Sequence, residues 1–142
     1  MKHLGRTIYF AALMLVVCAC QTPQKNTGEM KYLTIIPQPE SVNLSTGNFT
    51  IKNNTTVFCS NEELLLVANY MGAKITSALG FTLKNSVGTG NGINFILLNE
   101  KDENLGEEGY KLEVTPKNIS ITANKSAGVF YGVQTLMQML QP

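Results

Sequence analysis

The sequence predicts an α+β domain in which a mainly antiparallel or mixed sheet carries two helices packed on one face. Short β-rich runs separated by turn residues recur between residues 32 and 123. Two longer segments, 61–79 and 126–140, instead have apolar residues at helical spacing. No internal repeat is evident. The 142 residues are about one domain and fewer than the roughly 250 that a (β/α)₈ barrel typically needs.

The amino-terminal residues resemble a bacterial lipoprotein signal. Lys2, His3 and Arg6 form a positively charged region, and an apolar run of ten residues, 8–17, follows it. This run has the length of a secretory signal, since a membrane-spanning helix needs roughly 20 residues. We therefore expect residues 1–19 to be a lipoprotein signal peptide, with a plain signal peptide as the alternative.

Cys20 is the predicted lipidation site. It follows Ala19, the small residue that such a signal needs before the acceptor, whereas Cys18 follows the bulky Val17. Acyl chains on Cys20 would anchor the exported protein stably, because each buried CH₂ contributes about 0.8 kcal/mol. Gln21 in the next position favours the outer membrane. We expect the protein to be membrane-anchored at the outer membrane, in the periplasm or on the cell surface.

The polar segment 20–31 is predicted to be a flexible tether, and the folded domain is predicted to occupy residues 32–142. A first strand is expected over 32–36. It ends at Pro37 and Pro39, which cannot donate to a strand ladder. Further β-rich segments follow at 42–44, 48–52 and 55–59.

The first helix is predicted to begin at Ser60 or Asn61 and to end at Gly80, which can adopt the left-handed conformation of a helix stop. One face of this helix is apolar and is expected to pack on the sheet, with Tyr70 and Lys74 on the wetter side. The apolar stripe comprises Leu64, Ala68, Met71, Ile75, Ala78 and Leu79.

A strand over 81–84, a glycine-rich segment over 87–92 and a strongly apolar strand over 93–98 follow the first helix. The glycine-rich segment looks like a phosphate-binding loop. However, it lacks the Lys-Ser/Thr pair of such loops and precedes a strand, so we predict a hairpin turn there. The apolar strand is expected at the centre of the sheet. Residues 99–108 are predicted to form a charged loop.

The segments 110–114 and 119–123 alternate apolar and polar residues, which predicts a β-hairpin with one buried face. The last helix is predicted over 126–140. Gly128 and Gly132 lie one turn apart in it and offer a smooth face for close packing on the sheet. Its apolar stripe comprises Val129, Phe130, Val133, Leu136, Met137 and Leu140.

Chemically reactive side chains are sparse. Without residues 1–19 the chain has neither His nor Arg, so it lacks a zinc-binding cluster and a base that could activate Cys59. We predict that Cys59 is a buried, inert thiol and that Tyr110 and Tyr131 are core residues rather than sugar-binding ones. The net charge of +1 gives no basic surface for nucleic acid. No catalytic residue, cofactor or metal ligand is predicted.

The acidic residues are expected to be solvated. Glu62 and Glu63 lie at the start of the first helix, and Glu107 and Glu108 lie in the charged loop. A Ca²⁺ site built from Asp102 and its acidic neighbours is the alternative, although their spacing does not match an EF-hand.

The hairpin and the last helix together carry a recognisable pattern. Glu108-Gly109-Tyr110-Lys111-Leu112 opens it, and Ala127-Gly128-Val129-Phe130-Tyr131-Gly132-Val133-Gln134-Thr135-Leu136 closes it. With Ile35-Ile36-Pro37-Gln38-Pro39 near the start, these runs resemble the N-terminal domain of bacterial β-N-acetylhexosaminidases of glycoside hydrolase family 20. The resemblance covers about residues 32–141. Val129 and Met139 stand where the family usually has leucine.

The resemblance implies a non-catalytic domain that precedes a (β/α)₈ barrel, in which an Asp-Glu pair works with the 2-acetamido group of the substrate. We expect this chain to be the accessory domain of an enzyme that removes terminal N-acetylhexosamine from glycans. It would be a truncated product or fragment that is inactive alone. The missing barrel is the expected partner, and its absence predicts low solubility or self-association. A free-standing lipoprotein that binds glycan or protein is the alternative, although no residue pattern supports glycan contact.

Overall fold

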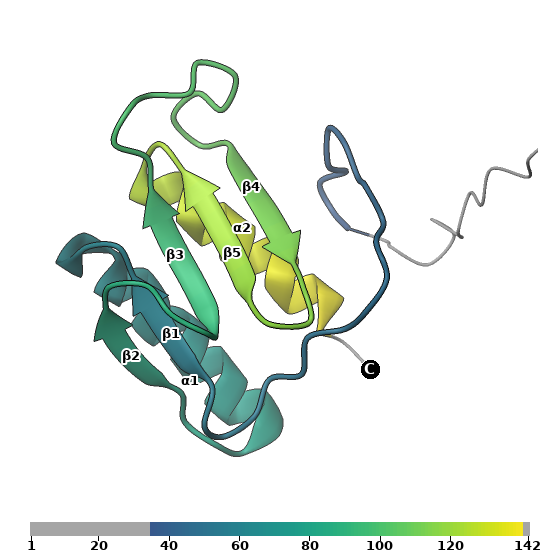
Figure 1. Ribbon diagram of the computed structural model, residues 1–142, viewed down its shortest axis with the longest axis vertical. Coiled ribbons are helices and arrows are strands. Elements are labelled where there is room, and N and C mark those ends of the chain that lie inside the picture. The colour runs from purple at the N-terminus through teal and green to yellow at the C-terminus, as the bar shows by residue number, and fades with distance from the viewer. Residues whose placement is uncertain (1–34, 141–142) are drawn as a thin grey trace, which may run out of the picture. The chain divides into compact units, whose positions relative to one another are not determined.

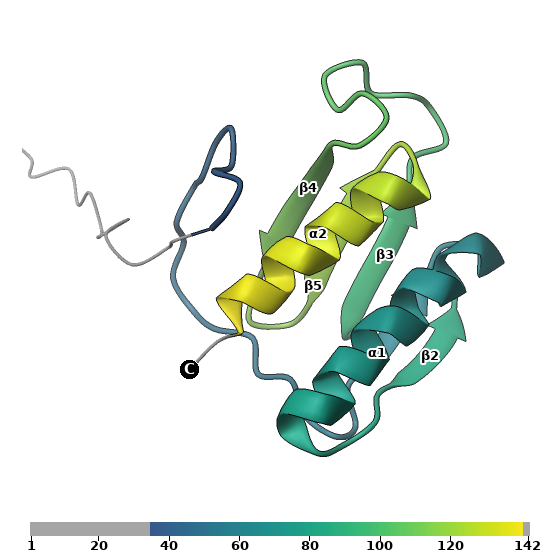
Figure 2. The same cartoon turned by 180° about the vertical axis from the view of Figure 1, so that it is seen from behind.

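The computed structural model describes residues 35–140, where one five-stranded sheet has two helices on one face (Figure 1 and Figure 2). The strand order across the sheet is β2-β1-β3-β5-β4. The strands are β1 (Thr56–Cys59), β2 (Lys84–Val87), β3 (Ile93–Leu97), β4 (Tyr110–Val114) and β5 (Ile119–Ala123), and the helices are η2 (Glu62–Leu64, a 3-10 turn), α1 (Leu65–Leu79) and α2 (Ser126–Met139). Cys20, the signal peptide and the tether lie outside the described residues. Among residues 35–140, none of the three helices is long and apolar enough to cross a membrane.

The sheet is mixed. Strands β1, β2, β3 and β5 are parallel, and β4 pairs with β5 in an antiparallel hairpin. The two helices on one face and the mixed sheet confirm the predicted α+β class. The sequence left open whether the sheet is mainly antiparallel or mixed, and the structure shows a mixed sheet. Strands β1 and β2 are parallel because α1 carries the chain back along the sheet before β2 begins, so both strands run in the same direction.

The hydrophobic core lies between the sheet and the helices. Strand β3 occupies the centre of the sheet, as predicted, and Ile93 and Phe95 from it are fully buried. Neighbouring strands and both helices add side chains of the same kind. These are Val57, Cys59, Ile119, Ile121 and Ala123 from the sheet, and Leu64, Ala68, Met71, Ile75, Val129, Val133 and Leu136 from the helical segments. The predicted stripe of α1 is therefore correct as far as Ile75, whereas Ala78 and Leu79 are exposed.

Helix α2 packs closely on the hairpin because two glycines face it. A Cβ atom on Gly128 would overlap the carbonyl oxygen of Gly109, and one on Gly132 would overlap the side chain of Ile121. This confirms the predicted close packing of α2. Gly72 in α1 faces open space instead, because a Cβ placed there would have no atom within 4 Å other than its chain neighbours and the backbone of its own helix. The two helices therefore contact the sheet in different ways.

The glycine-rich segment is a crossover and not the predicted hairpin turn. The segment leaves β2 after Val87, which pairs with Cys59 of β1, and enters β3 at Ile93, which pairs with Val57 of β1. It therefore passes over β1, on the face of the sheet opposite the helices (Figure 1). Gly90 lies on the ring of Phe58, where an added Cβ would come within 2.5 Å of the ring. The buried side chain of Asn94 accepts a hydrogen bond from the backbone N–H of Gly90 and donates one to its carbonyl oxygen.

The residues before β1 form no strand within 35–54, so the predicted extended segments at 42–44 and 48–52 are not part of the sheet. Instead, residues 35–54 form an irregular segment along one end of the domain, which we call the strap. The side-chain amide of Gln138 accepts a hydrogen bond from the Ile36 N–H (2.9 Å) and donates one to its carbonyl oxygen (2.8 Å). Gly47 packs against Pro116 in the hairpin turn. Of the first predicted strand, 32–36, only its last two residues are described, and neither is in a strand.

One strand boundary also differs from the prediction. Strand β2 spans Lys84–Val87, whereas the sequence predicted a strand over 81–84. The left-handed Gly80 ends α1 as predicted, with φ of 78°. Leu83 then turns inward and is buried in the core, so residues 81–83 serve as the connection from the helix to the sheet edge.

Candidate interaction face on the helices

Helices α1 and α2 lie side by side and contact each other through two aromatic rings (Figure 2). The ring centroids of Tyr70 and Phe130 are 5.2 Å apart in a tilted arrangement. The side-chain amide of Gln134 donates a hydrogen bond to the Tyr70 hydroxyl at 3.0 Å. Tyr70 is thus half-buried between the helices and not on the wetter side as predicted. Lys74 is exposed as predicted, with its Nζ 5.6 Å from the centroid of the Tyr70 ring.

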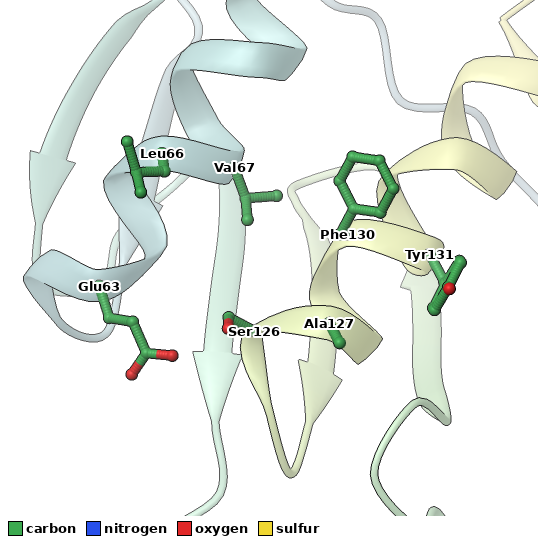
Figure 3. A pocket seen from close by; sticks show the side chains of 7 residues that line it. All are labelled: Glu63, Leu66, Val67, Ser126, Ala127, Phe130 and Tyr131. Carbon is green, nitrogen blue, oxygen red and sulfur yellow. The ribbon is translucent and has the colours of Figure 1, made fainter.

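A groove lies where both helices begin, and we call it the helix groove. It encloses about 340 Å³ and is lined by Glu63, Leu66, Val67, Ser126, Ala127, Phe130 and Tyr131. Figure 3 shows the side chains of η2 and α1 on one side of this groove and those of the first turns of α2 on the other. Leu66 is 79 % exposed, more than any other large hydrophobic side chain in the described residues.

Tyr131 lies at the rim of the helix groove and is 43 % exposed, so the prediction that it is a core residue is wrong. It follows Val129 by two residues, and on a helix such neighbours lie on nearly opposite sides. Tyr110 packs against the core as predicted, although it is only half-buried. Its ring lies under Gly132, and its hydroxyl forms a hydrogen bond with Thr135.

A second hollow of about 610 Å³ lies at the other end of the helix pair. The strap forms one wall with Phe49 and Ile51, and the carboxyl-terminal turns of α1 and α2 form the others. The amide of Gln138 at its edge is already bonded to the backbone of Ile36, and the amide of Gln134 to Tyr70. The two glutamine amides that line it are therefore engaged within the domain.

The other candidate groups have structural roles. Cys59 is fully buried, and burial raises the pKa of its thiol, so it is an unreactive core residue as predicted. The acidic residues Glu62, Glu63, Glu107 and Glu108 are exposed, as predicted for solvated charges. No group of three or more potential metal-binding side chains occurs among residues 35–140.

Asp102 is engaged by protein groups instead of a cation. Its carboxylate accepts hydrogen bonds from the Lys111 ammonium at 2.7 Å and from the backbone N–H of Asn104, and these bonds hold the pKa of Asp102 below its usual value. The side chain of Asn124 bonds to both the N–H and the carbonyl oxygen of Asp102 and to the carbonyl oxygen of Gly106. The charged loop is thus held in one shape by Asn124, a residue whose role no sequence pattern indicated.

Comparison with known proteins identifies the family. The family model described as glycosyl hydrolase family 20, domain 2, matches residues 32–142. The chain is 32 % identical over 130 residues to a Beta-hexosaminidase of Porphyromonas gingivalis, which covers 90 % of this chain and 17 % of the relative. It is 30 % identical over 108 residues to a Lacto-N-biosidase of Bifidobacterium bifidum, covering 75 % of this chain and 10 % of the relative. The chain thus spans about a sixth and a tenth of the length of these relatives.

Solved structures show the same fold. The N-acetyl-β-hexosaminidase of Streptomyces plicatus, in complex with Thio-NAglucal, aligns with a TM-score of 0.68 and 34 % identity over 78 % of this chain and 21 % of its own. The GH20 β-N-acetylhexosaminidase of Streptomyces coelicolor aligns with a TM-score of 0.67 and 31 % identity over 75 % and 21 % of the two chains. These findings confirm the resemblance that the hairpin and the last helix carry. The chain therefore belongs to glycoside hydrolase family 20, and it corresponds to the non-catalytic domain 2 of that family.

Proposed function

We propose that this chain is the accessory domain of a β-N-acetylhexosaminidase, an enzyme that removes terminal N-acetylhexosamine from glycans. One observation carries the proposal. The matching family model is that of domain 2, and the same segment makes up only 17 % of the Porphyromonas gingivalis Beta-hexosaminidase and 21 % of the Streptomyces plicatus enzyme. The chemistry is therefore assigned to a separate catalytic domain, which is the proposed partner of this one.

The carboxylates of the described residues support this division. The hydrolysis that the resemblance implies needs an Asp-Glu pair that works with the 2-acetamido group of the substrate. Asp102 is instead bonded to Lys111, and its neighbour Glu103 pairs with Lys101 at 3.1 Å on the surface. Glu63 borders the helix groove without a second carboxylate among the residues that line it. None of these carboxylates is arranged as an acid–base pair.

The test compares the chain alone with a chimaera. The chain alone is expected to give no turnover of a chromogenic N-acetylglucosaminide. In the chimaera, residues 32–142 replace the matching segment of the Porphyromonas gingivalis Beta-hexosaminidase. We expect it to be folded and active, whereas the same enzyme with the segment deleted is expected to be unstable. Turnover by the chain alone, or a chimaera as unstable as the deletion, would contradict the accessory role.

We also propose that Cys20 is acylated and anchors the protein to the outer membrane. The basic start, the short apolar run and the small Ala19 before Cys20 support this. Cells that express the full chain and are fed labelled palmitate should give a labelled protein in the membrane fraction. Cys20→Ala should abolish the label, and the matched Cys18→Ala should keep it. A label that survives Cys20→Ala would assign the site elsewhere.

A further inference from the structure

We propose that Asn91 is a site of spontaneous deamidation, at which the backbone nitrogen of Gly92 converts the side-chain amide into an isoaspartate, and that this change weakens the start of β3. The proposal does not depend on the accessory role, because it concerns the chemistry of this domain alone. Asn91 and Gly92 are the last residues of the glycine-rich crossover (Figure 1). They form the only Asn-Gly pair in the sequence.

The reaction needs no reagent other than water. The nitrogen of Gly92 loses its proton to solvent base and attacks Cγ of Asn91, so a C–N bond forms and a succinimide ring closes. The bond from Cγ to the amide nitrogen breaks, and that nitrogen takes up a proton and leaves as ammonia. Water then opens the ring at either carbonyl, which leaves aspartate or isoaspartate. In total, one amide and one water become one carboxylate and one ammonium ion.

Both reacting groups are accessible to each other. Asn91 is exposed, and neither its side-chain amide nor the N–H of Gly92 forms a hydrogen bond with the rest of residues 35–140. Neither residue is held in a strand, since β3 begins at Ile93. Because residue 92 is a glycine, no Cβ atom hinders its nitrogen as it approaches the Asn91 side chain.

Two neighbouring asparagines show what protects such a side chain. Asn85 lies in β2, paired with Val57 of β1, and its amide donates a hydrogen bond to Oδ1 of Asn69 at 2.7 Å. Asn94 is buried in β3, and its side chain bonds to both backbone groups of Gly90. Asn85 and Asn94 can therefore react only when their strands open locally.

An isoaspartate at position 91 lengthens the backbone where the fold has no room for it. The side-chain CH₂ enters the main chain, so the crossover gains one carbon atom before Gly92. Gly92 is buried, and a Cβ atom on it would overlap the carbonyl oxygen of Thr56. Its own carbonyl accepts a hydrogen bond from the N–H of Ile119 at 2.9 Å. The change therefore displaces the residue that leads into Ile93, which is fully buried in the central strand.

The test follows the four asparagines of one peptide. The purified full chain is incubated in mildly alkaline buffer and cleaved with trypsin, which releases residues 85–101, and mass spectrometry locates the carboxylates formed. Asn91 should react at least about tenfold faster than Asn85 or Asn94, because those two must wait for local opening. A folded chain that keeps Asn91 intact, while the urea-unfolded chain converts it, would overturn the proposal.

Asn99 and two substitutions are the controls. Asn99 is exposed like Asn91 but is followed by Glu100, whose side chain hinders the attacking nitrogen, so Asn99 should react more slowly. Asn91→Gln should abolish the isoaspartate, which an isoaspartyl methyltransferase detects, because glutamine must close a larger ring. Asn85→Gln should leave the signal unchanged. A signal that survives Asn91→Gln, or equal rates at Asn91 and Asn99, would overturn the assignment of the site.

The melting temperature tests the effect on β3. The aged chain, with isoaspartate at position 91, should melt roughly 4–8 °C below the fresh chain, a shift typical of one lost contact in a domain of about 100 residues. The matched control is Asn91→Asp, which adds the same charge at an exposed position without lengthening the backbone. It should melt within about 2 °C of the fresh chain. An aged chain that melts together with Asn91→Asp would overturn the weakening of β3.

Discussion

The two faces of the sheet are built from the same strands but have opposite properties. The face under the helices holds Phe95, Ile121 and the other fully buried side chains. The bare face holds Thr122, Lys111 and Glu113, and a glycine crossover covers only part of it. Strand β3 shows the difference within one element, because Phe95 is fully buried while the next residue, Ile96, is half-buried. Stability therefore resides on one side of the sheet, and the other side tolerates polar contact.

The largest expected effect comes from this pair of neighbours on β3. Phe95→Ala should lower the free energy of unfolding by about 3–5 kcal/mol, because it removes a large ring from a packed core. Ile96→Ala should lower it by about 1 kcal/mol, since a half-buried side chain loses less apolar contact. Urea denaturation of both variants, followed by circular dichroism, measures the difference. Similar losses would mean that the bare face is also covered in the folded protein.

The next largest change in stability distinguishes the two helices, because substitution of a glycine should have opposite effects in α2 and in α1. Gly132→Val should destabilise the domain by about 2–3 kcal/mol, because the new side chain runs into Ile121 and the ring of Tyr110. Gly72→Ala in α1 should instead stabilise it by about 0.5–1 kcal/mol, since Gly72 faces open space and alanine favours the helix. Thermal unfolding of both variants tests this. A stabilising Gly132→Val would show that α2 can move away from the sheet.

A smaller effect belongs to the bare face. Gly90→Ala should cost about 1–2 kcal/mol, because the methyl group meets the Phe58 ring beneath the crossover. Phe58→Leu in the same chain should relieve that contact, so a double-mutant cycle should give a favourable coupling between the two substitutions. Purely additive losses would show that the crossover does not rest on Phe58.

The smallest effect is electrostatic and lies in the charged loop. Because the pKa of Asp102 is lowered in the folded state, its contribution to stability is present above the unfolded pKa, near 3.8, and is lost as the pH falls through the folded pKa. Asp102→Asn should therefore remove part of the loss of stability with acid below about pH 4. Unfolding curves measured between about pH 2 and 6 would show it. An unchanged slope in the variant would assign the acid sensitivity to other carboxylates.

Much of the covered face could be predicted from sequence, because burial there follows local periodicity. The alternation of apolar and polar residues in 110–114 and 119–123 predicted the hairpin with its turn. The apolar stripe from Leu64 to Ile75 predicted the buried side of α1. The pair of glycines in α2 gave its close packing on the sheet. In each case, which side chains are buried depends on one face of a single helix or strand, and the pattern of that face can be seen in a short stretch of sequence.

The features that sequence reasoning missed depend on distant partners. Nothing in the segment 88–92 shows that β2 and β3 are both parallel to β1, so a crossover looks like a turn. Leu66 is the last of three consecutive leucines, and the run itself does not show which of them faces outward. Tyr131 and Leu66 are 65 positions apart, so the helix groove exists only after α1 and α2 have packed together. The resemblance nevertheless identified the family, because its motifs are runs of consecutive residues in the hairpin and the last helix.

The bond between Gln138 and Ile36 has a mechanical consequence. It joins positions 102 residues apart, so the described chain enters and leaves the fold at neighbouring points (Figure 1). A pull applied between the strap and the end of α2 is borne first by two hydrogen bonds to one side chain. The strands of the sheet are not peeled apart until these bonds break. The core is therefore shielded from such a pull until these two bonds break.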